Sequence, residues 1–185
     1  MQQYQLRLGP LTRNLPLIQI APNTRIASFV LLGDAELTQY AAQQLAQRLT
    51  HTPFDYLVTM ESKGIPLAQA LSQLTHHPRF IVLRKSVKPY MTHPHTIAVT
   101  AITTHTPQQL VLDDADATLL RGKRVVIVDD VISTGGSLEA ANRLLQQVGA
   151  QVVAQTAILA EGAAGTRTDI EFLAKLPLFD GNSSE

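Results

Sequence analysis

The chain has 185 residues, with 15 Lys and Arg against 15 Asp and Glu, and it contains no cysteine. This length suits one domain, and the balanced charge gives no argument for binding to nucleic acid or an anionic membrane. Without cysteine there are no disulfides or thiolate metal sites, and no segment reads as a signal peptide or membrane span, so we expect a cytoplasmic protein.

The first third of the chain predicts an arm followed by a strand, a helix and a second strand. Residues 1–24 mix apolar residues with prolines and predict an extended, irregular arm. A strand is expected over residues 26–32, up to Gly33. Asp34 can then cap a helix in which apolar residues recur every four positions as far as Leu49. Residues 54–60 predict the next strand.

A short polar segment, Glu61-Ser62-Lys63-Gly64, stands between that strand and a helix that begins near Pro66. A helix N-terminus presents unpaired backbone N–H groups, which together with the Lys63 ammonium would favour an anion. A surface turn with a solvated lysine is the alternative interpretation.

A strand over residues 80–83 leads into Arg84-Lys85-Ser86-Val87-Lys88-Pro89, which is either a solvated charged turn or a cationic site. Residues 91–107 predict a long loop that ends in strand-like segments around residues 97–103 and 110–112. An acidic run from Asp113 to Asp116 then predicts a turn and the start of a helix.

The most informative stretch is RVVIVDDVISTGGS, residues 124–137. Its four β-branched residues predict a strand buried on both faces of a parallel sheet. Asp129 and Asp130 follow, then the small residues 133–137, and then a helical pattern from Leu138. Glycines and a helix N-terminus suit a phosphate, whereas paired carboxylates suit the vicinal hydroxyls of a sugar or a hydrated Mg²⁺. Together they indicate a ribose 5-phosphate; the alternative is an ordinary strand–helix turn with solvated or capping carboxylates.

The remaining elements complete the sheet. Gly149 predicts the end of the helix, and residues 151–159 predict a further strand. We expect a flexible loop over residues 161–165 and a last short strand over residues 170–173. Residues 175–179 are apolar enough to pack on the core, and a disordered tail is expected from Asp180.

Residues 124–137 resemble the phosphoribosyl pyrophosphate (PRPP) binding motif of the type I phosphoribosyltransferases, in which a hydrophobic strand leads into two acidic residues and a Ser/Thr/Gly loop. The resemblance implies an α/β fold with a central, mainly parallel sheet flanked by helices, a small hood subdomain and a flexible lid. We expect a single domain over residues 1–185, with the arm or hood over residues 1–24, the lid over residues 84–107 and the tail over residues 180–185.

The resemblance also implies a role for each motif. The Glu61–Gly64 segment is similar to the Glu-x-Arg-Gly of adenine phosphoribosyltransferases, and Arg84–Pro89 is similar to the root of their lid. In relatives that lid can reach a neighbouring subunit, which implies a homodimer. Mg²⁺ is the implied cofactor, held by Asp129 and Asp130 through water or the ribose. The expected site residues are Asp129, Asp130, Arg84 and Lys85 in catalysis; Ser133, Thr134, Gly135, Gly136 and Ser137 at the 5′-phosphate; Glu61, Ser62, Lys63, Gly64 and Lys88 at the pyrophosphate; and Val131 and Ile132 in the base pocket.

Two positions bear on the base. Ser133 stands where enzymes for hypoxanthine and guanine carry a carboxylate, and adenine enzymes have a small residue there. Adenine enzymes also carry Glu-Tyr-Gly on the returning arm of the lid, where this chain has Ile102-Thr103-Thr104-His105. We predict transfer of the phosphoribosyl group of PRPP to a purine, adenine first, with another purine or a pyrimidine as the alternative.

A non-catalytic PRPP-sensing regulator of transcription is a second class of function. Such a regulator needs a DNA-binding segment. The arm of about two dozen residues before the first expected strand is too short and too rich in proline to form a three-helix DNA-binding domain.

Overall fold

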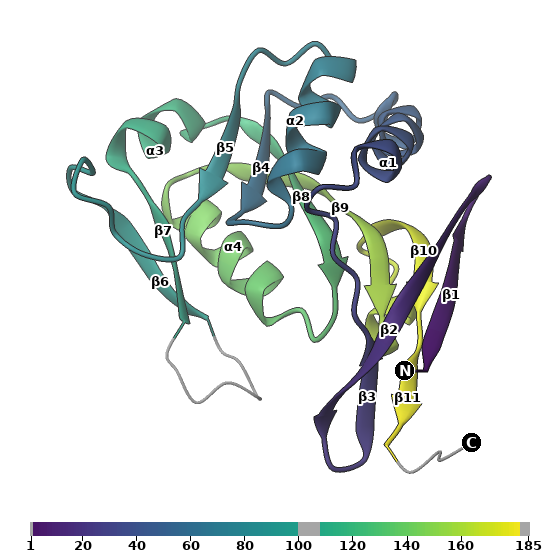
Figure 1. Cartoon of the computed structure of the whole chain (residues 1–185). Coiled ribbons are helices and arrows are strands. Elements are labelled where there is room, and N and C mark those ends of the chain that lie inside the picture. The colour runs from purple at the N-terminus through teal and green to yellow at the C-terminus, as the bar shows by residue number, and fades with distance from the viewer. Residues whose placement is uncertain (1, 100–107, 182–185) are drawn as a thin grey trace.

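The computed structural model describes residues 2–99 and 108–181. These residues form a five-stranded parallel sheet, a four-stranded antiparallel sheet beside it, and a two-stranded hairpin. Figure 1 shows helices on both faces of the parallel sheet. Within the described part of the chain, none of the helices has both the length and the apolar character needed to cross a membrane.

The parallel sheet has the strand order β10-β9-β8-β4-β5. Its strands are β4 (Tyr56–Met60), β5 (Phe80–Leu83), β8 (Arg124–Ile132), β9 (Gln151–Glu161) and β10 (Glu171–Leu176). Helices α1 (Ala35–Leu49) and α2 (Ile65–Leu74) pack on one face, and α3 (Asp114–Leu120) and α4 (Gly136–Gln147) on the other. This arrangement confirms the predicted α/β fold.

Strand β8 lies at the centre of the sheet and is buried on both faces, as its run of β-branched residues predicts. Val125 and Ile127 pack into the core on the α3 and α4 side, whereas Val126 and Val128 pack into the core on the α1 and α2 side. Each of these four residues is at most 1% exposed. Successive residues of a strand point to opposite faces, so a continuous apolar run fits only a strand covered on both sides.

The N-terminal region differs from the irregular arm that its prolines predict. It forms β1 (Gln3–Leu8), β2 (Leu11–Ala21) and β3 (Thr24–Ala27), and the C-terminal strand β11 (Leu178–Asp180) completes that sheet. Alternate leucines of β1, Leu6 and Leu8, are buried against the main body, and tertiary packing of this kind overrides local preference.

Three further expectations need correction. The strand expected over residues 26–32 ends at Ala27, and Val30 and Leu32 beyond it are exposed. The expected flexible loop over residues 161–165 forms a 3₁₀ helix, η1 (Gly162–Thr166), in which Ala164 is buried. Asp180, placed in the disordered tail, belongs to β11, where it pairs with β3; residues 182–185 lie outside the described part.

The predicted lid is described only in part. Strand β6 (His95–Val99) pairs with β7 (Gln108–Leu112), so the strand expected over residues 97–103 begins two residues earlier. Residues 100–107, which include the 102–105 segment compared with the lid of adenine enzymes, lie outside the described residues.

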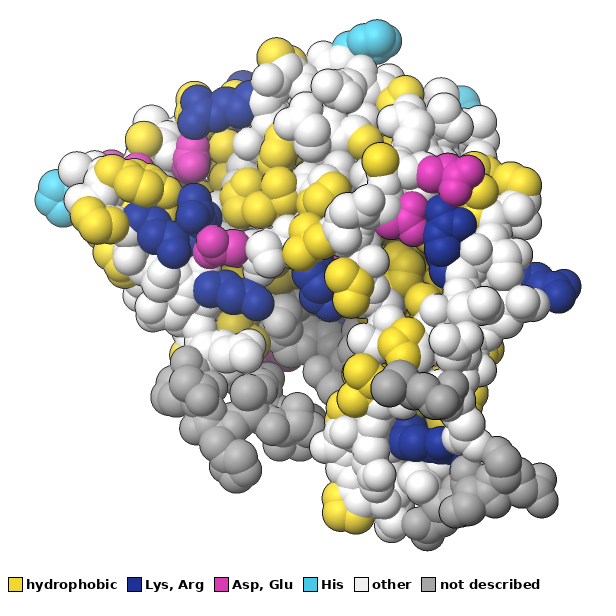
Figure 2. Space-filling view, viewed as in Figure 1, with side chains coloured by type: hydrophobic (Ala, Val, Ile, Leu, Met, Phe, Trp, Pro, Cys, Tyr) yellow, Lys and Arg dark blue, Asp and Glu magenta, His cyan; other side chains and the backbone are white. Residues whose placement is uncertain are grey.

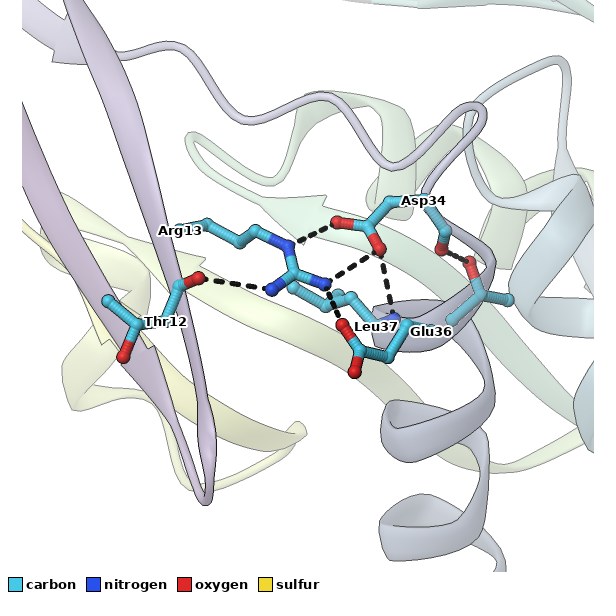
Figure 3. Close-up of polar contacts among 6 residues, drawn as sticks. Thr12, Arg13, Asp34, Glu36 and Leu37 are labelled. Atoms are coloured by element: carbon cyan, nitrogen blue, oxygen red, sulfur yellow. Dashed lines mark hydrogen bonds and ion pairs between the residues drawn. The ribbon is translucent and has the colours of Figure 1, made fainter.

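An ion-pair network fastens the N-terminal sheet to the start of helix α1 (Figure 3). Asp34 caps α1 as predicted, its Oδ1 accepting the Leu37 N–H at 3.0 Å. The Arg13 side chain from β2 donates to both Asp34 oxygens, at 2.6 and 3.0 Å, and to Glu36 at 2.7 Å. One carboxylate therefore serves both as a helix cap and as the anchor of a strand far away in the sequence.

We expect Asp34→Ala to lower the free energy of unfolding by about 1–2 kcal/mol, because it removes the helix cap and leaves Arg13 without its main partner. The Arg13 hydrogen bond holds the pKa of Asp34 below its usual value, so this contribution is present above the ordinary pKa and is lost as the pH falls through the lowered one. Urea unfolding at pH 7 and at pH 3 measures both effects. Glu36→Ala is the control, since Glu36 is exposed and its removal is expected to change stability by less than about 0.5 kcal/mol. Equal losses in the two variants would contradict the assignment.

Candidate active site

Three of the predicted segments meet where parallel strands end. The Glu61–Gly64 segment follows β4, the Arg84–Lys88 segment follows β5, and the acidic pair lies near the end of β8. The carboxyl ends of parallel strands share one edge, so these segments gather there. They line a cleft of about 170 Å³ whose walls include Ser62, Lys63, Lys85, Asp129, Asp130 and Ser137. Figure 2 shows Lys and Arg side chains gathered around the ends of β4 and β5.

The motif predicts that the acidic pair follows the strand, but Asp129 and Asp130 lie within β8. Pairing with β4 stops at Val128, opposite Thr59, whereas pairing with β9 continues to Ile132. One edge of the strand therefore keeps its backbone partner, and the other faces the loop after β4. Asp130 is buried at 3% exposure and Asp129 is half-buried, so both carboxylates belong to the floor of the cleft rather than to a mobile loop.

The two carboxylates have few partners among the described residues. The Asp130 N–H donates to Asp129 Oδ1 at 2.9 Å. Asp130 Oδ2 is buried and forms no hydrogen bond there, although the Lys63 ammonium lies 3.4 Å away. Burial, followed by the charge of Asp130, raises the pKa of Asp129 well above its usual value. These surroundings therefore favour a proton, a cation or a hydroxyl donor at this pair.

Mg²⁺ fits these donors only in part. Among residues 2–99 and 108–181, no three or more acidic or histidine side chains are grouped to hold a metal ion. The orphaned Asp130 oxygen and the half-buried Asp129 can supply one or two oxygen contacts. Mg²⁺ commonly binds through one or two carboxylates and completes its shell with water and substrate oxygens, so the pair suits an ion that arrives with a phosphorylated ligand.

The Glu61 carboxylate holds the cationic segment after β5. Its Oε2 accepts the Lys85 N–H at 2.9 Å, its Oε1 pairs with Arg84 Nη2 at 3.2 Å, and Lys88 Nζ lies 4.0 Å away. The Lys85 N–H and then the Arg84 side chain hold the pKa of Glu61 below its usual value. Glu61, predicted at the pyrophosphate, is thus placed to position cations, and an anion would meet those cations rather than this carboxylate.

The cations of this segment have different surroundings. Lys85 lines the cleft, whereas the Arg84 guanidinium is held between Glu61 and the Tyr90 hydroxyl, 3.0 Å from Nη1. The Lys88 ammonium donates to Ser86 Oγ at 2.8 Å. Of the three, Lys85 is therefore the cation placed to meet a ligand in the cleft.

Gly64 lets helix α2 begin directly beside the acidic pair. A Cβ atom at this position would lie 2.3 Å from Thr59 Oγ1 and 3.2 Å from Asp129 Oδ1, so any side chain would push the loop away. The Glu61–Ser62 peptide bond at the start of the loop is cis. Pro66 occupies the first turn of α2, where a missing N–H leaves no helix hydrogen bond unmade.

The loop over residues 133–137 forms its own hollow of about 120 Å³, which Asp129 also lines. Helix α4 begins at Gly136, and Gly135 before it has φ +84°, a backbone conformation that favours glycine. Gly135 has no side chain with which to cap the helix, so its first N–H groups remain suited to an anion. Because Asp129 borders both the hollow and the cleft, the two spaces adjoin.

The residues predicted for the base pocket have different surroundings. Val131 lines both the cleft and the hollow, whereas Ile132 is 3% exposed and packs mainly in the core. The sequence did not indicate that Met60, Val99 and residues 108–110 line the cleft. Backbone hydrogen bonds of 2.8 Å in both directions between Arg84 and Val111 bring β7 to this site, and no local pattern marks such a pairing.

We expect Asp129→Asn to raise the free energy of unfolding by about 1–3 kcal/mol at pH 8. The pKa of Asp129 is higher in the folded chain than in the unfolded one, so wild-type stability falls as the pH rises from the ordinary to the raised value. Asparagine does not titrate, so the gain should be smaller at pH 5; urea unfolding at both values measures it. Asp55→Asn is the control, and it should lower the free energy of unfolding at pH 8 instead of raising it, because hydrogen bonds from Arg124 lower the pKa of Asp55. A destabilised Asp129→Asn at pH 8 would contradict the prediction.

Comparison with known proteins agrees with this geometry. Residues 34–175 match the phosphoribosyl transferase domain. The chain is 32% identical over 157 residues to a hypoxanthine/guanine phosphoribosyltransferase of Methanococcus voltae, covering 82% of this chain and 79% of that protein. It is 34% identical over 144 residues to an adenine phosphoribosyltransferase of Beijerinckia indica, covering 77% and 76%. A crystal structure of adenine phosphoribosyltransferase from Thermoanaerobacter pseudethanolicus shares the fold, with a TM-score of 0.69, 22% identity and coverage of 87% of this chain and 95% of that chain. The chain therefore belongs to the phosphoribosyltransferase family and has its type I fold.

Proposed function

We propose that this chain is a purine phosphoribosyltransferase that transfers the 5-phosphoribosyl group of PRPP to adenine and releases pyrophosphate. The observation that carries the proposal is the position of the acidic pair between two sites that suit anions. The 133–137 loop and the N-terminus of α4 lie on one side, and Lys63 and Lys85 lie on the other. PRPP has the same order of groups: a 5′-phosphate, a ribose diol and a pyrophosphate.

Each group of PRPP then has a place in the site. The 5′-phosphate accepts hydrogen bonds from the 133–137 loop, and the ribose hydroxyls donate to Asp129 and Asp130. The pyrophosphate meets Ser62, Lys63 and the N-terminal end of α2, together with Lys85, which lines the same cleft. The hydroxyl donors also satisfy Asp130 Oδ2, the buried oxygen that has no hydrogen-bond partner among the described residues.

The chemistry follows from the charges in this arrangement. Breaking the bond between ribose C1 and the pyrophosphate leaves positive charge on the sugar and negative charge on the departing group. The acidic pair stabilises the sugar, and Lys63 and Lys85 neutralise the pyrophosphate. Glu61 acts through Lys85 by holding its backbone, so it is a positioning residue. Mg²⁺ bound with PRPP would add charge neutralisation, and Asp129 and Asp130 are the residues that fit it.

Two observations bear on the base. Ser133 follows the acidic pair with a small neutral side chain, which favours adenine over a 6-oxopurine. The identity with the hypoxanthine/guanine enzyme of Methanococcus voltae supports a second candidate, in which the base is hypoxanthine or guanine. The homodimer implied by the resemblance stays a prediction.

The substrate test is pyrophosphate release from PRPP and Mg²⁺ with adenine, hypoxanthine, guanine, xanthine, uracil or orotate. We expect turnover with adenine and at most weak turnover with the others. Preference for hypoxanthine or guanine would keep the transferase and replace the base. Binding of PRPP with no turnover on any base would instead favour the effector-binding role.

Lys85→Ala should lower kcat by about 10²-fold with the preferred base, because it removes a cation that neutralises the departing pyrophosphate. Lys123→Ala is the matched control, since Lys123 is an exposed lysine of the turn before β8 and does not line the cleft. Steady-state kinetics of both variants measure the effect. Similar kcat values in the two variants would exclude the proposed role of Lys85.

A further inference from the structure

Arg167 lies against the 133–137 loop, although it stands thirty residues beyond that loop in the chain. A Cβ atom on Gly135 would be 2.7 Å from Arg167 Nη1, so this nitrogen touches the backbone just before α4. No pattern in the sequence links the two positions. The crossover from β9 to β10, which contains η1, brings them together.

The Arg167 side chain is held in place by its neighbours. Its Nε and Nη2 donate to the two Asp169 oxygens, at 2.9 and 2.6 Å. The Asp169 backbone carbonyl accepts from Gln155 Nε2 at 3.1 Å, and Gln155 Oε1 accepts from Asn142 Nδ2 of α4 at 2.6 Å. This network ties the guanidinium to the helix whose N-terminus the loop precedes. The Arg167 side-chain hydrogen bonds to the described residues come from Nε and Nη2. Nη1, the other terminal nitrogen, lies beside the 133–137 loop.

The hollow of the 133–137 loop lacks a positive charge of its own. Its lining consists of Asp129 and residues 131–138, of which only Asp129 is ionisable as an acid or base. A sugar phosphate carries a charge of about −1.5 to −2 at neutral pH, so neutral N–H groups and a helix dipole balance it incompletely beside a carboxylate. A guanidinium is the side chain best suited to complete such a phosphate site.

We propose that Arg167 is a binding residue for the 5′-phosphate, that Asp169 positions it, and that Gly135 leaves the space in which Nη1 lies beside the loop. This inference rests on the proposed function, since it assumes a phosphorylated ribose in the 133–137 hollow. Asp169 occupies Nε and Nη2, so Nη1 remains for the phosphate.

The experiment compares two probes, ribose 5-phosphate and inorganic pyrophosphate, by isothermal titration calorimetry. Arg167→Ala should weaken ribose 5-phosphate binding by about 10- to 100-fold and leave pyrophosphate binding within about twofold, because the two probes occupy different sites. Arg167→Lys keeps the charge but loses the fork with Asp169, so it should recover only part of the affinity. Arg143→Ala is the matched control, an exposed arginine on α4 whose loss changes the net charge equally.

The outcomes separate this inference from the function on which it rests. A selective loss of ribose 5-phosphate binding in Arg167→Ala supports it. Unchanged ribose 5-phosphate binding, or an equal loss for both probes, overturns it and leaves the transferase in place. If the wild-type chain binds neither probe, the proposed function fails, and this inference fails with it.

Discussion

The site depends on one geometric constraint: strand β8 extends beyond its pairing with β4 but not beyond its pairing with β9. The backbone around Asp129 and Asp130 is therefore held rigidly on one side and left open on the other. Gly64 uses that opening, because only a residue without a side chain lets α2 begin against the carboxylates. The acidic pair and the positive end of a helix thus lie directly beside each other at the cleft.

The carboxylates at the cleft have two different kinds of surroundings. Glu61 has its partners already, since it accepts the Lys85 N–H and pairs with Arg84, and its pKa is lowered accordingly. Asp129 and Asp130 have too few partners, so burial and mutual repulsion raise the pKa of Asp129. Glu61 therefore holds the cationic segment in place, whereas the acidic pair keeps oxygen atoms that can accept hydrogen bonds from a ligand. Opposite pKa shifts of neighbouring carboxylates are typical of groups with different tasks.

The unpaired carboxylate oxygen in this arrangement lowers the stability of the folded chain. A buried polar oxygen without a hydrogen bond, such as Asp130 Oδ2, lowers stability until something satisfies it. Stability is recovered elsewhere, for example where Arg13 and Asp34 join the N-terminal sheet to α1. Functional sites commonly combine local strain or unpaired groups with a well-packed surrounding scaffold.

The elements whose causes are local could be predicted from the residues alone. The β-branched run marked β8, Asp34 marked the start of α1, and the acidic pair with its glycine loop indicated a ribose phosphate before any fold was known. Which distant residues complete these elements depends on the tertiary fold. The N-terminal strands form because Leu6 and Leu8 find a core, Glu61 meets Lys85 because β4 and β5 are neighbours, and Arg167 reaches Gly135 through the crossover after β9. Contacts between residues far apart in the chain leave no periodic pattern in either segment, so only the folded backbone shows them.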